Sequence, residues 1–265
     1  MINPDHKLNK TARRERILLE LRLTPHLRTS DLAERFGVTS ETIRRDVTAL
    51  EGAGQVSRDF GGVTATTPGM RPQVETRNRS HLSERERVGR LAASMVRPDD
   101  LVMIDAGSTT LQFARTLAFS ETPVNVITNS VNVAIVLGQS RAAHVRLCPG
   151  DFMAAEAAVV GPETIDFLRR FHATYAFVGM SGISERGFSE AVPGFAGIKR
   201  AMLAQSEHLV VMADSHKFGR TDSDLIAVFG PDMTVISGGA PAQDLAGAMA
   251  AAGCLLRIAS SCASG

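Results

Sequence analysis

The sequence is poor in the features that mark secreted, membrane and disulfide-bonded proteins. Its 265 residues include three cysteines, one tyrosine and no tryptophan. Cys148, Cys254 and Cys262 lie far apart without a CxxC pair, which argues against a disulfide framework or a zinc site. The longest apolar runs, such as residues 209–213, are far shorter than the roughly 20 residues that cross a bilayer. The first ten residues are polar and lack the apolar core of a secretory signal. These absences predict a cytoplasmic protein.

Positive charge is concentrated towards the N-terminus, although the whole chain carries a formal net charge of only +1. Residues 1–90 contain 17 Lys and Arg against 12 Asp and Glu, a balance of +5, whereas residues 91–265 contain 12 against 16, a balance of −4. This asymmetry favours a basic module that meets a polyanion, joined to an acidic globular body. Arginines that merely keep a helix soluble would give the same count.

The first part of the basic segment is expected to form two short helices. Residues 11–23 place apolar side chains on one face, and Pro25 ends this helix because proline cannot continue the backbone hydrogen bonds. A second helix is predicted to begin with Thr29 or Ser30 as its N-cap, and Gly37 after it permits a left-handed turn.

A third helix is predicted directly after this turn, capped by Thr39 or Ser40. Ile43, Val47 and Leu50 recur on one face and form its buried stripe. Two short helices joined by a tight glycine turn are the helix-turn-helix arrangement, in which the first residues of the second helix face base edges in the major groove. Hydroxyl groups there can reach bases or phosphates, and arginine can fork onto guanine or a phosphate oxygen.

Residues 55–64 follow as two expected short strands around a turn, the wing of a winged helix, with Arg58 placed to contact phosphate. The stretch from Arg14 to Val63, above all SDLAERFGVTSETIRRDVTALEGAGQVSRDFGGV, resembles the N-terminal domain of the DeoR family of bacterial transcriptional repressors. The resemblance rests most on the TIRRD core, the glycine turn and the wing, and it implies binding to double-stranded operator DNA. The predicted DNA-binding residues are Arg28, Thr29, Thr39, Ser40, Glu41, Thr42, Arg44, Arg45 and Arg58.

The remainder of the chain has the pattern of a doubly wound, mostly parallel α/β domain. Short apolar runs alternate with helical segments, as in strands buried on both faces of a parallel sheet. A helix is expected from residue 83 to about residue 96. The predicted domains are residues 9–65 (winged helix-turn-helix), 66–81 (a polar linker with two prolines), 82–252 (α/β effector domain) and 253–265 (a C-terminal tail). The predicted strands are residues 101–104, 124–127, 145–148, 175–178, 209–213 and 235–236.

Polar loops follow five of these strands, where ligands bind in doubly wound sheets. The loop of residues 105–110 is the strongest candidate. Its glycine lets the backbone approach an anion, its three hydroxyl groups can donate hydrogen bonds, and the next helix begins there with its partial positive charge. Serine and threonine are also ordinary helix caps, so this loop alone is a weak signal. The combination of five polar loops favours a phosphate or polyol ligand.

The resemblance to the DeoR family extends through this domain. The segments IDAGSTTLQFARTL, VITNSVNVAIVL, FVGMSGIS and VMADSHKFGR are similar, in order and spacing, to the family's effector domain. That domain is related to pentose-phosphate isomerases, and the resemblance implies a response to a phosphorylated sugar or a related carbohydrate metabolite. After the sixth strand, where the family commonly carries Ile-Thr-Asp, this chain has Ser237-Gly238-Gly239. The implied effector-binding residues are Asp105, Gly107, Ser108, Thr109, Thr110, Asn129, Ser181, Lys199 and Lys217.

A structural role is an open alternative for several of these residues. Lys199 lies on a helical run and would then be a solvated surface lysine. Asp105 would cap the next helix, and Asn129 would form a turn. We expect no metal site, because His144, His172, His208 and His216 show no ligand spacing, and we assign no cofactor.

Three functions fit the two predicted domains. The first is a ligand-gated transcriptional repressor of carbohydrate-catabolism genes, in which the effector favours the form that does not bind DNA. The second is a sugar-phosphate isomerase with an appended DNA-binding domain. This one is disfavoured because the loop after the fourth strand, residues 179–184, contains no carboxylate to act as a base. The third is an architectural DNA-binding protein, which would not need so large a second domain.

A homo-oligomer, either a dimer or a tetramer, is expected for the repressor. A single winged helix makes few base contacts, so operator specificity calls for a symmetric assembly on repeated half-sites.

Overall fold

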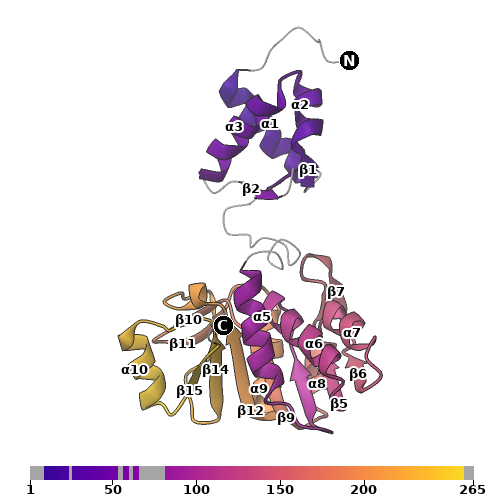
Figure 1. Cartoon of the computed structure of the whole chain (residues 1–265), viewed down its shortest axis with the longest axis vertical. Coiled ribbons are helices and arrows are strands. Elements are labelled where there is room, and N and C mark those ends of the chain that lie inside the picture. The colour runs from indigo at the N-terminus through magenta and orange to yellow at the C-terminus, as the bar shows by residue number, and fades with distance from the viewer. Residues whose placement is uncertain (1–8, 24–25, 53–55, 60–61, 66–80, 260–265) are drawn as a thin grey trace, which may run out of the picture. The chain divides into compact units, whose positions relative to one another are not determined.

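The chain is described by a computed structural model over residues 9–23, 26–52, 56–59, 62–65 and 81–259 (Figure 1). It divides into two compact units, Met1–Pro72 and Gln73–Gly265. The predicted linker, residues 66–81, lies outside the described ranges except for His81. Within these ranges no helix is long and apolar enough to cross a bilayer.

The first unit packs three helices with a small antiparallel sheet whose strand order is β1-β3-β2. The two predicted wing strands are confirmed. Strand β1 was not predicted; it pairs with β3 and places Leu27 opposite Val63, and both side chains are buried in the core of this unit. The elements are α1 (Lys10–Leu23), β1 (His26–Arg28), α2 (Thr29–Phe36), α3 (Ser40–Gly52), β2 (Val56–Asp59) and β3 (Gly62–Ala65).

In this unit the predicted glycine turn is confirmed, but the predicted N-cap of α2 is wrong. Gly37 has φ 59°, the left-handed conformation expected of it, and it ends α2. Helix α3 is capped by Thr39, whose hydroxyl accepts a hydrogen bond from the Thr42 backbone N–H at 3.2 Å. The prediction that Thr29 or Ser30 caps α2 is wrong, because Arg28 occupies that position and its side chain forms no capping hydrogen bond. Strand β1 runs directly into α2 and leaves no residue between them for a cap.

The second unit is built on a seven-stranded sheet of order β15-β14-β12-β9-β4-β5-β6, in which all neighbouring strands are parallel. The predicted doubly wound fold and its six strands are confirmed. The strands are β4 (Leu101–Ile104), β5 (Val124–Thr128), β6 (Ala143–Leu147), β9 (Ala173–Gly179), β12 (Ser206–Ala213), β14 (Met233–Ser237) and β15 (Leu255–Ile258).

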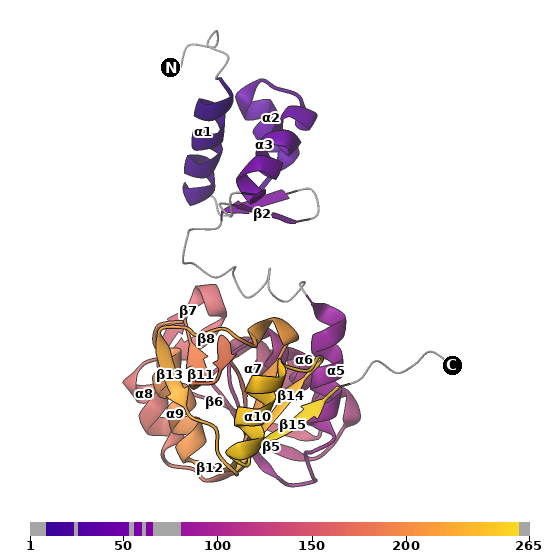
Figure 2. The same cartoon turned by 90° about the vertical axis from the view of Figure 1, so that its left-hand side faces the viewer.

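Helices cover both faces of this sheet (Figures 1 and 2). The alternation of side chains along the strands divides the core in two. Along β12, Val210 and Met212 pack against one set of helices, whereas Leu209 and Val211 pack against the other. The first set is α5 (Leu82–Ala93), α6 (Ser108–Ser120) and α7 (Val131–Leu137); the second is α8 (Pro162–Leu168), α9 (Phe195–Ala204) and α10 (Gln243–Ala251).

The strand order reverses between β4 and β9. Strands β4, β5 and β6 extend in one direction, and β9, β12, β14 and β15 extend in the other. In doubly wound sheets, ligands bind beyond the carboxyl ends of the strands at such a reversal. The loops after β4 and β9, which carry Asp105 and Ser181, therefore lie where this fold places its ligand.

Two parts of the second unit differ from prediction. The expected C-terminal tail of residues 253–265 is wrong in its first half, because Leu255–Ile258 forms β15 and pairs with β14. Small antiparallel pieces were also missed because each is only a few residues long. They are β7 (Asp151–Met153), β8 (Ala158–Val160), β10 (Gly182–Ser184), β11 (Gly187–Glu190) and β13 (Asp224–Ala227), with the 3-10 turns η1 (Ala154–Glu156) and η2 (Ser215–Lys217).

Candidate DNA-binding surface and sensor site

The outer face of α3 carries exposed charged side chains. The side chains of Glu41, Arg44 and Arg45 are 60%, 65% and 79% exposed, respectively. Glu41 lies 3.8 Å from Arg44 and 3.4 Å from Arg45, measured between carboxylate oxygen and guanidinium nitrogen. Ion pairs this exposed contribute little to stability. Both arginines can therefore exchange Glu41 for phosphate or base acceptors at small cost.

The inner face of α3 is held by a buried carboxylate. Asp46, next to Arg45 in sequence, accepts hydrogen bonds from the Nε atoms of Arg13 at 2.6 Å and Arg14 at 3.0 Å. Its side chain is 2% exposed, and both arginines belong to α1. Asp46 thus fixes α3 on α1, whereas its neighbours Arg44 and Arg45 point to solvent.

The other predicted DNA contacts have mixed exposure. Arg28 and Ser40 are exposed, whereas Thr29 and Thr42 are half-buried. Thr39 is exposed, but its hydroxyl lies 2.9 Å from that of Thr42 and caps α3. Arg58 lies in β2, opposite Val63, and its side chain is outside the described residues.

In the second unit, Asp105 bridges the strand-order reversal. It follows β4, is 1% exposed, and its Oδ1 accepts a hydrogen bond from the Gly179 N–H of β9 at 3.1 Å. The side chain therefore does not cap α6, which was the structural alternative. Its Oδ2 accepts a hydrogen bond from Lys199 Nζ.

Lys199 is a buried lysine with its donors engaged. It lies on α9, is 2% exposed, and donates to Asp105 and to the Gly179 carbonyl. Its Nζ also lies 3.3 Å from Oε2 of Glu190. The alternative of a solvated surface lysine is wrong, because α9 packs this face onto the sheet.

Glu190 was missed by the sequence analysis, which considered only the loops directly after strands. The residue ends β11 and is 2% exposed. Its Oε1 accepts hydrogen bonds from the Ser181 hydroxyl and from the backbone N–H groups of Ala191 at 2.8 Å and Val192 at 3.0 Å. The loop of residues 179–184 contains no carboxylate, as the sequence indicated. The site nevertheless contains one beside Ser181, because Glu190 reaches it from β11.

A hairpin pattern could have revealed this residue. Ile183 and Phe188 flank a polar segment that ends in glycine, as in a short hairpin. Folding at that segment pairs Gly182 with Ser189 and brings the end of β11 back to Ser181.

The electrostatics of this buried cluster follow from one lysine between two carboxylates. Burial alone would lower the pKa of Lys199, but Asp105 and Glu190 outweigh it and raise the pKa above its ordinary value. Burial raises the pKa of Asp105, against the opposing effect of Lys199. Lys199 is therefore protonated, with a carboxyl group on either side.

The three hydroxyl groups of the loop before α6 differ in their hydrogen bonding. Thr110 donates a hydrogen bond to the Gly107 carbonyl at 2.9 Å and so closes the first turn. Ser108 and Thr109 are 8% and 7% exposed, and within the described part of the chain neither hydroxyl has a hydrogen-bond partner. Gly107 occupies the N-cap without a side-chain hydrogen bond, which leaves the first N–H groups of α6 without one.

Asn129, Ser181 and Lys217 lie at the same edge of the sheet in different roles. Asn129 donates to the Val159 carbonyl at 3.1 Å, but its Oδ1 is buried without a partner in the described residues. Ser181 is fully buried and orients Glu190. Lys217, on η2 after β12, is half-buried and contributes its charge near Asp214.

A second buried ion pair fixes the beginning of α5. Arg85 donates to Oδ2 of Asp214 through Nη2 at 2.8 Å and Nε at 3.3 Å, and the two side chains are 5% and 2% exposed. Burial alone would raise the pKa of Asp214, but the hydrogen bonds from Arg85 and the charge of Lys217 lower it below its ordinary value. Asp214 is therefore a carboxylate that fastens α5 to the end of β12.

Comparisons with known proteins agree with this two-part organisation. A family model described as the DeoR-like helix-turn-helix domain matches residues 13–68, and one described as the DeoR C-terminal sensor domain matches residues 80–237. The second match alone spans more than half of the chain. The ribose 5-phosphate isomerase A of Methanocaldococcus jannaschii matches at 17% identity and a TM-score of 0.39, over 52% of this chain and 55% of that one. This likeness is too distant to add to the argument.

Several curated relatives match most of the chain, two transcriptional repressors among them. The HTH-type transcriptional repressor GlcR of Bacillus subtilis is 31% identical over 194 residues, which is 73% of this chain and 74% of that protein. The glycerol-3-phosphate regulon repressor of Escherichia coli K12 is 27% identical over 214 residues, 80% and 84% of the respective chains. With a helix-turn-helix unit and a sensor unit that both match, the chain belongs to the DeoR family of transcriptional regulators.

Proposed function

We propose that the protein is a repressor of carbohydrate-catabolism genes that a phosphorylated sugar or polyol releases from its operator. The observation that carries this proposal is the exposed outer face of α3, where Arg44 and Arg45 pair with the solvent-exposed carboxylate of Glu41. On a helix-turn-helix this face enters the major groove, where each arginine can fork onto guanine or bind phosphate.

The phosphate of the effector is assigned to the loop before α6. The hydroxyl groups of Ser108 and Thr109 lack partners within the described residues, and the first turn of α6 has no side-chain cap. Both features suit an anion at a helix N-terminus. The E. coli relative is named for the glycerol-3-phosphate regulon, a name that combines a phosphate with a polyol.

The hydroxyl groups of the effector are assigned to the cluster of Asp105, Glu190 and Lys199. The N–H donors of Lys199 are directed at Asp105, Glu190 and the Gly179 carbonyl, so they are not available to a phosphate. The carboxyl oxygens of the cluster can still accept hydrogen bonds from hydroxyl donors. In this assignment Lys199 orients the carboxylates and does not itself hold the phosphate.

Sensing without catalysis is the second part of the proposal. An isomerase needs a base that is free to take a proton from carbon. Glu190 accepts three hydrogen bonds at Oε1 and pairs with Lys199 at Oε2, which stabilises its charge and occupies its lone pairs. The presence of two carboxylates and a lysine nevertheless favours an isomerase as the second candidate function, so the protein must be assayed for it.

We further infer that the repressor acts as a dimer or tetramer. Two α3 helices related by symmetry would read two half-sites, and the effector would favour an arrangement that does not match their spacing. The proposal would be contradicted by a monomer that binds one operator tightly in sedimentation and footprinting experiments.

The DNA-binding part is tested by selecting bound duplexes from a random library with the full chain, followed by fluorescence anisotropy on the enriched sequence. We expect specific binding that weakens steeply with salt, because phosphate contacts release counterions. No enrichment over a scrambled duplex would overturn the DNA-binding proposal.

The sensing part is tested by thermal shift with phosphorylated sugars, sugar alcohol phosphates and their unphosphorylated parents. A compound that raises the Tm should also release the selected duplex. Ser108→Ala should weaken its binding by about 1.5–3 kcal/mol, the range for a hydrogen bond to a charged group. The matched control is Ser120→Ala, at the opposite end of α6, where the hydroxyl donates to the Leu117 carbonyl. Equal losses in both variants would contradict the phosphate assignment.

The isomerase alternative is tested in the same samples. Aldose and ketose phosphates that bind should remain unconverted in proton NMR spectra over a day. If the wild type converts them and Glu190→Gln does not, the protein is an isomerase and the proposal of sensing without catalysis is wrong.

A further inference from the structure

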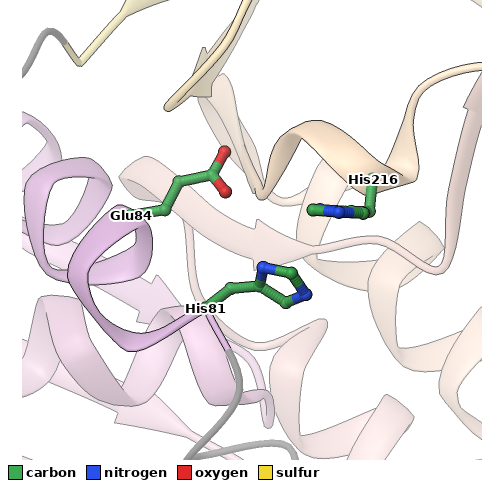
Figure 3. Close-up of side chains that lie close together, drawn as sticks. All are labelled: His81, Glu84 and His216. Carbon is green, nitrogen blue, oxygen red and sulfur yellow. The ribbon is translucent and has the colours of Figure 1, made fainter.

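Three side chains that the proposed function does not use converge on one point of the sensor unit (Figure 3). His81 and Glu84 come from the beginning of α5, and His216 comes from η2, far away in the sequence. One potential ligand atom from each residue lies within 4.8 Å of the others. The two imidazole rings have centroids 4.0 Å apart. The histidines show no metal-ligand spacing along the sequence, but the fold brings His81 and His216 from distant segments to within contact of each other.

The Glu84 carboxylate is held in place before any ligand arrives. Its Oε1 accepts a hydrogen bond from the Ser215 backbone N–H at 2.7 Å. Its side chain lies against Gly238 so closely that a Cβ at that position would come within 2.1 Å of Glu84 Cγ. The glycine that replaces the family's usual pattern after the sixth strand thus makes room for this side chain.

His81 has a backbone conformation that is uncommon for residues other than glycine. Its φ is 51°, in the left-handed region that residues other than glycine seldom adopt. It stands at the N-cap of α5 but makes no side-chain capping hydrogen bond. The structure gains no cap from this conformation, which instead brings the imidazole to His216 (Figure 3).

The chemistry of the three donors selects the ligand. Two neutral imidazole nitrogens and one carboxylate oxygen are typical of divalent transition metal ions, and a set of two histidines and one glutamate is common for Zn²⁺. Neighbouring Asp214, whose Oδ1 lies 3.9 Å from His216 Nδ1, adds negative charge.

We propose that His81, Glu84 and His216 form a binding site for one divalent transition metal ion per chain, with Zn²⁺ as the favoured ion. Ligand atoms around Zn²⁺ lie roughly 3.4 Å apart, given bonds of about 2.0–2.2 Å. Both histidines are exposed, so small rotations of their rings close the remaining gap. Three protein ligands leave one tetrahedral position open for water or an oxygen of another molecule.

The position of the site gives the ion a structural consequence. It joins the first residues of α5 to η2, beside the buried pair of Arg85 and Asp214. Lys217, a predicted effector contact, is the residue next to His216 on η2. A bound ion would therefore restrain the segment that carries this lysine. Metal binding itself does not depend on the proposed repressor function.

The test uses the full chain after treatment with a chelator and removal of that chelator. Zn²⁺ is titrated in competition with a chromophoric chelator, and bound metal is counted by elemental analysis after desalting. We expect one ion per chain. His81→Ala, His216→Ala and Glu84→Gln should each weaken Zn²⁺ binding by at least about tenfold, since even the loss of outer groups costs that much at zinc sites.

Matched controls separate this site from adventitious binding by surface histidines. His172→Ala removes a histidine that is 67% exposed and pairs instead with Glu207 at 3.8 Å. It should leave Zn²⁺ affinity unchanged. Co²⁺ should give the visible absorption of a four-coordinate ion in the wild type and in His172→Ala but not in His216→Ala. Circular dichroism checks that each variant folds. Equal Zn²⁺ affinity in all variants, or no retained metal in the wild type, would overturn the proposal.

Discussion

The two units of the molecule use charged side chains in opposite ways. On α3 of the first unit, Arg44 and Arg45 are more than half exposed and lie next to each other in the sequence. In the second unit, Lys199 is 3% exposed in its side chain and meets Asp105 and Glu190, which come from other elements. The first arrangement leaves charge available to a partner, and the second neutralises most of it internally.

This difference follows from the cost of desolvating charge. An exposed arginine keeps its hydration until DNA replaces it, so folding neither needs nor prevents its pairing. A buried lysine must find its partners during folding, because an unpaired charge in the interior is strongly destabilising. The exposed face of α3 can therefore change with little effect on stability, whereas the buried cluster of Asp105, Glu190 and Lys199 cannot.

The largest expected effect is at Lys199. Lys199→Met keeps the length of the side chain but leaves Asp105 and Glu190 buried without their cation. Breaking a buried ion pair costs about 3–5 kcal/mol, and the second unit should lose that much of its free energy of unfolding. Urea unfolding of the full chain followed by circular dichroism measures it. Arg169→Met, at a side chain 64% exposed, is the control and should change stability by less than about 0.5 kcal/mol.

Asp46 tests the comparison within one unit, because it is a buried charged residue in the same unit as the exposed Arg44 and Arg45. Asp46→Ala leaves Arg13 and Arg14 without their shared acceptor and should destabilise the first unit by about 1.5–3 kcal/mol, the range for hydrogen bonds to charged groups. Thermal unfolding of the full chain would record the change. If DNA affinity falls while the first unit stays as stable as in the wild type, Asp46 takes part in recognition and its assigned role is wrong.

Arg44→Ala and Arg45→Ala should have the reverse profile. Each should weaken operator binding by roughly 1–3 kcal/mol and leave stability within about 0.5 kcal/mol of the wild type. Anisotropy on the selected duplex and urea unfolding of the same samples give the two numbers. Unchanged affinity in both variants would contradict the placement of α3 in the major groove. A loss of stability as large as that of Asp46→Ala would show that the outer and inner faces of α3 do not differ in their contribution to folding.

The smallest expected effect concerns the thiols. Burial raises the pKa of Cys148 to about 12 and that of Cys254 to about 11. A raised pKa means that the folded state retains the proton, so the reactive thiolate is scarce at pH 8 and increases only as the pH rises towards these values. Titration with a thiol reagent at pH 8 should find two fewer reactive groups in the native protein than in urea. Equal counts would show that these sites open readily.

The sequence predicted well where structure depends on local pattern. Residues close in sequence and the repeat of apolar positions are enough to predict three features. These are the turn at Gly37, the buried stripe of Ile43, Val47 and Leu50, and the six apolar strands. The prediction failed at the cap of α2, because β1 consumes the preceding residues. It also failed at residues 255–258, where an edge strand with few buried side chains has little apolar pattern to detect.

The candidate sites divide along the same line. Local sequence alone indicated the contact face of α3, since its residues lie within two turns of one helix, and it indicated the α6 loop through its residue types. Only the tertiary structure brought Glu190 to Lys199 and His81 to His216, because these pairs depend on which strands become neighbours. Periodicity determines the elements of this protein, whereas the packing of these elements against one another determines which side chains from distant parts of the sequence lie together.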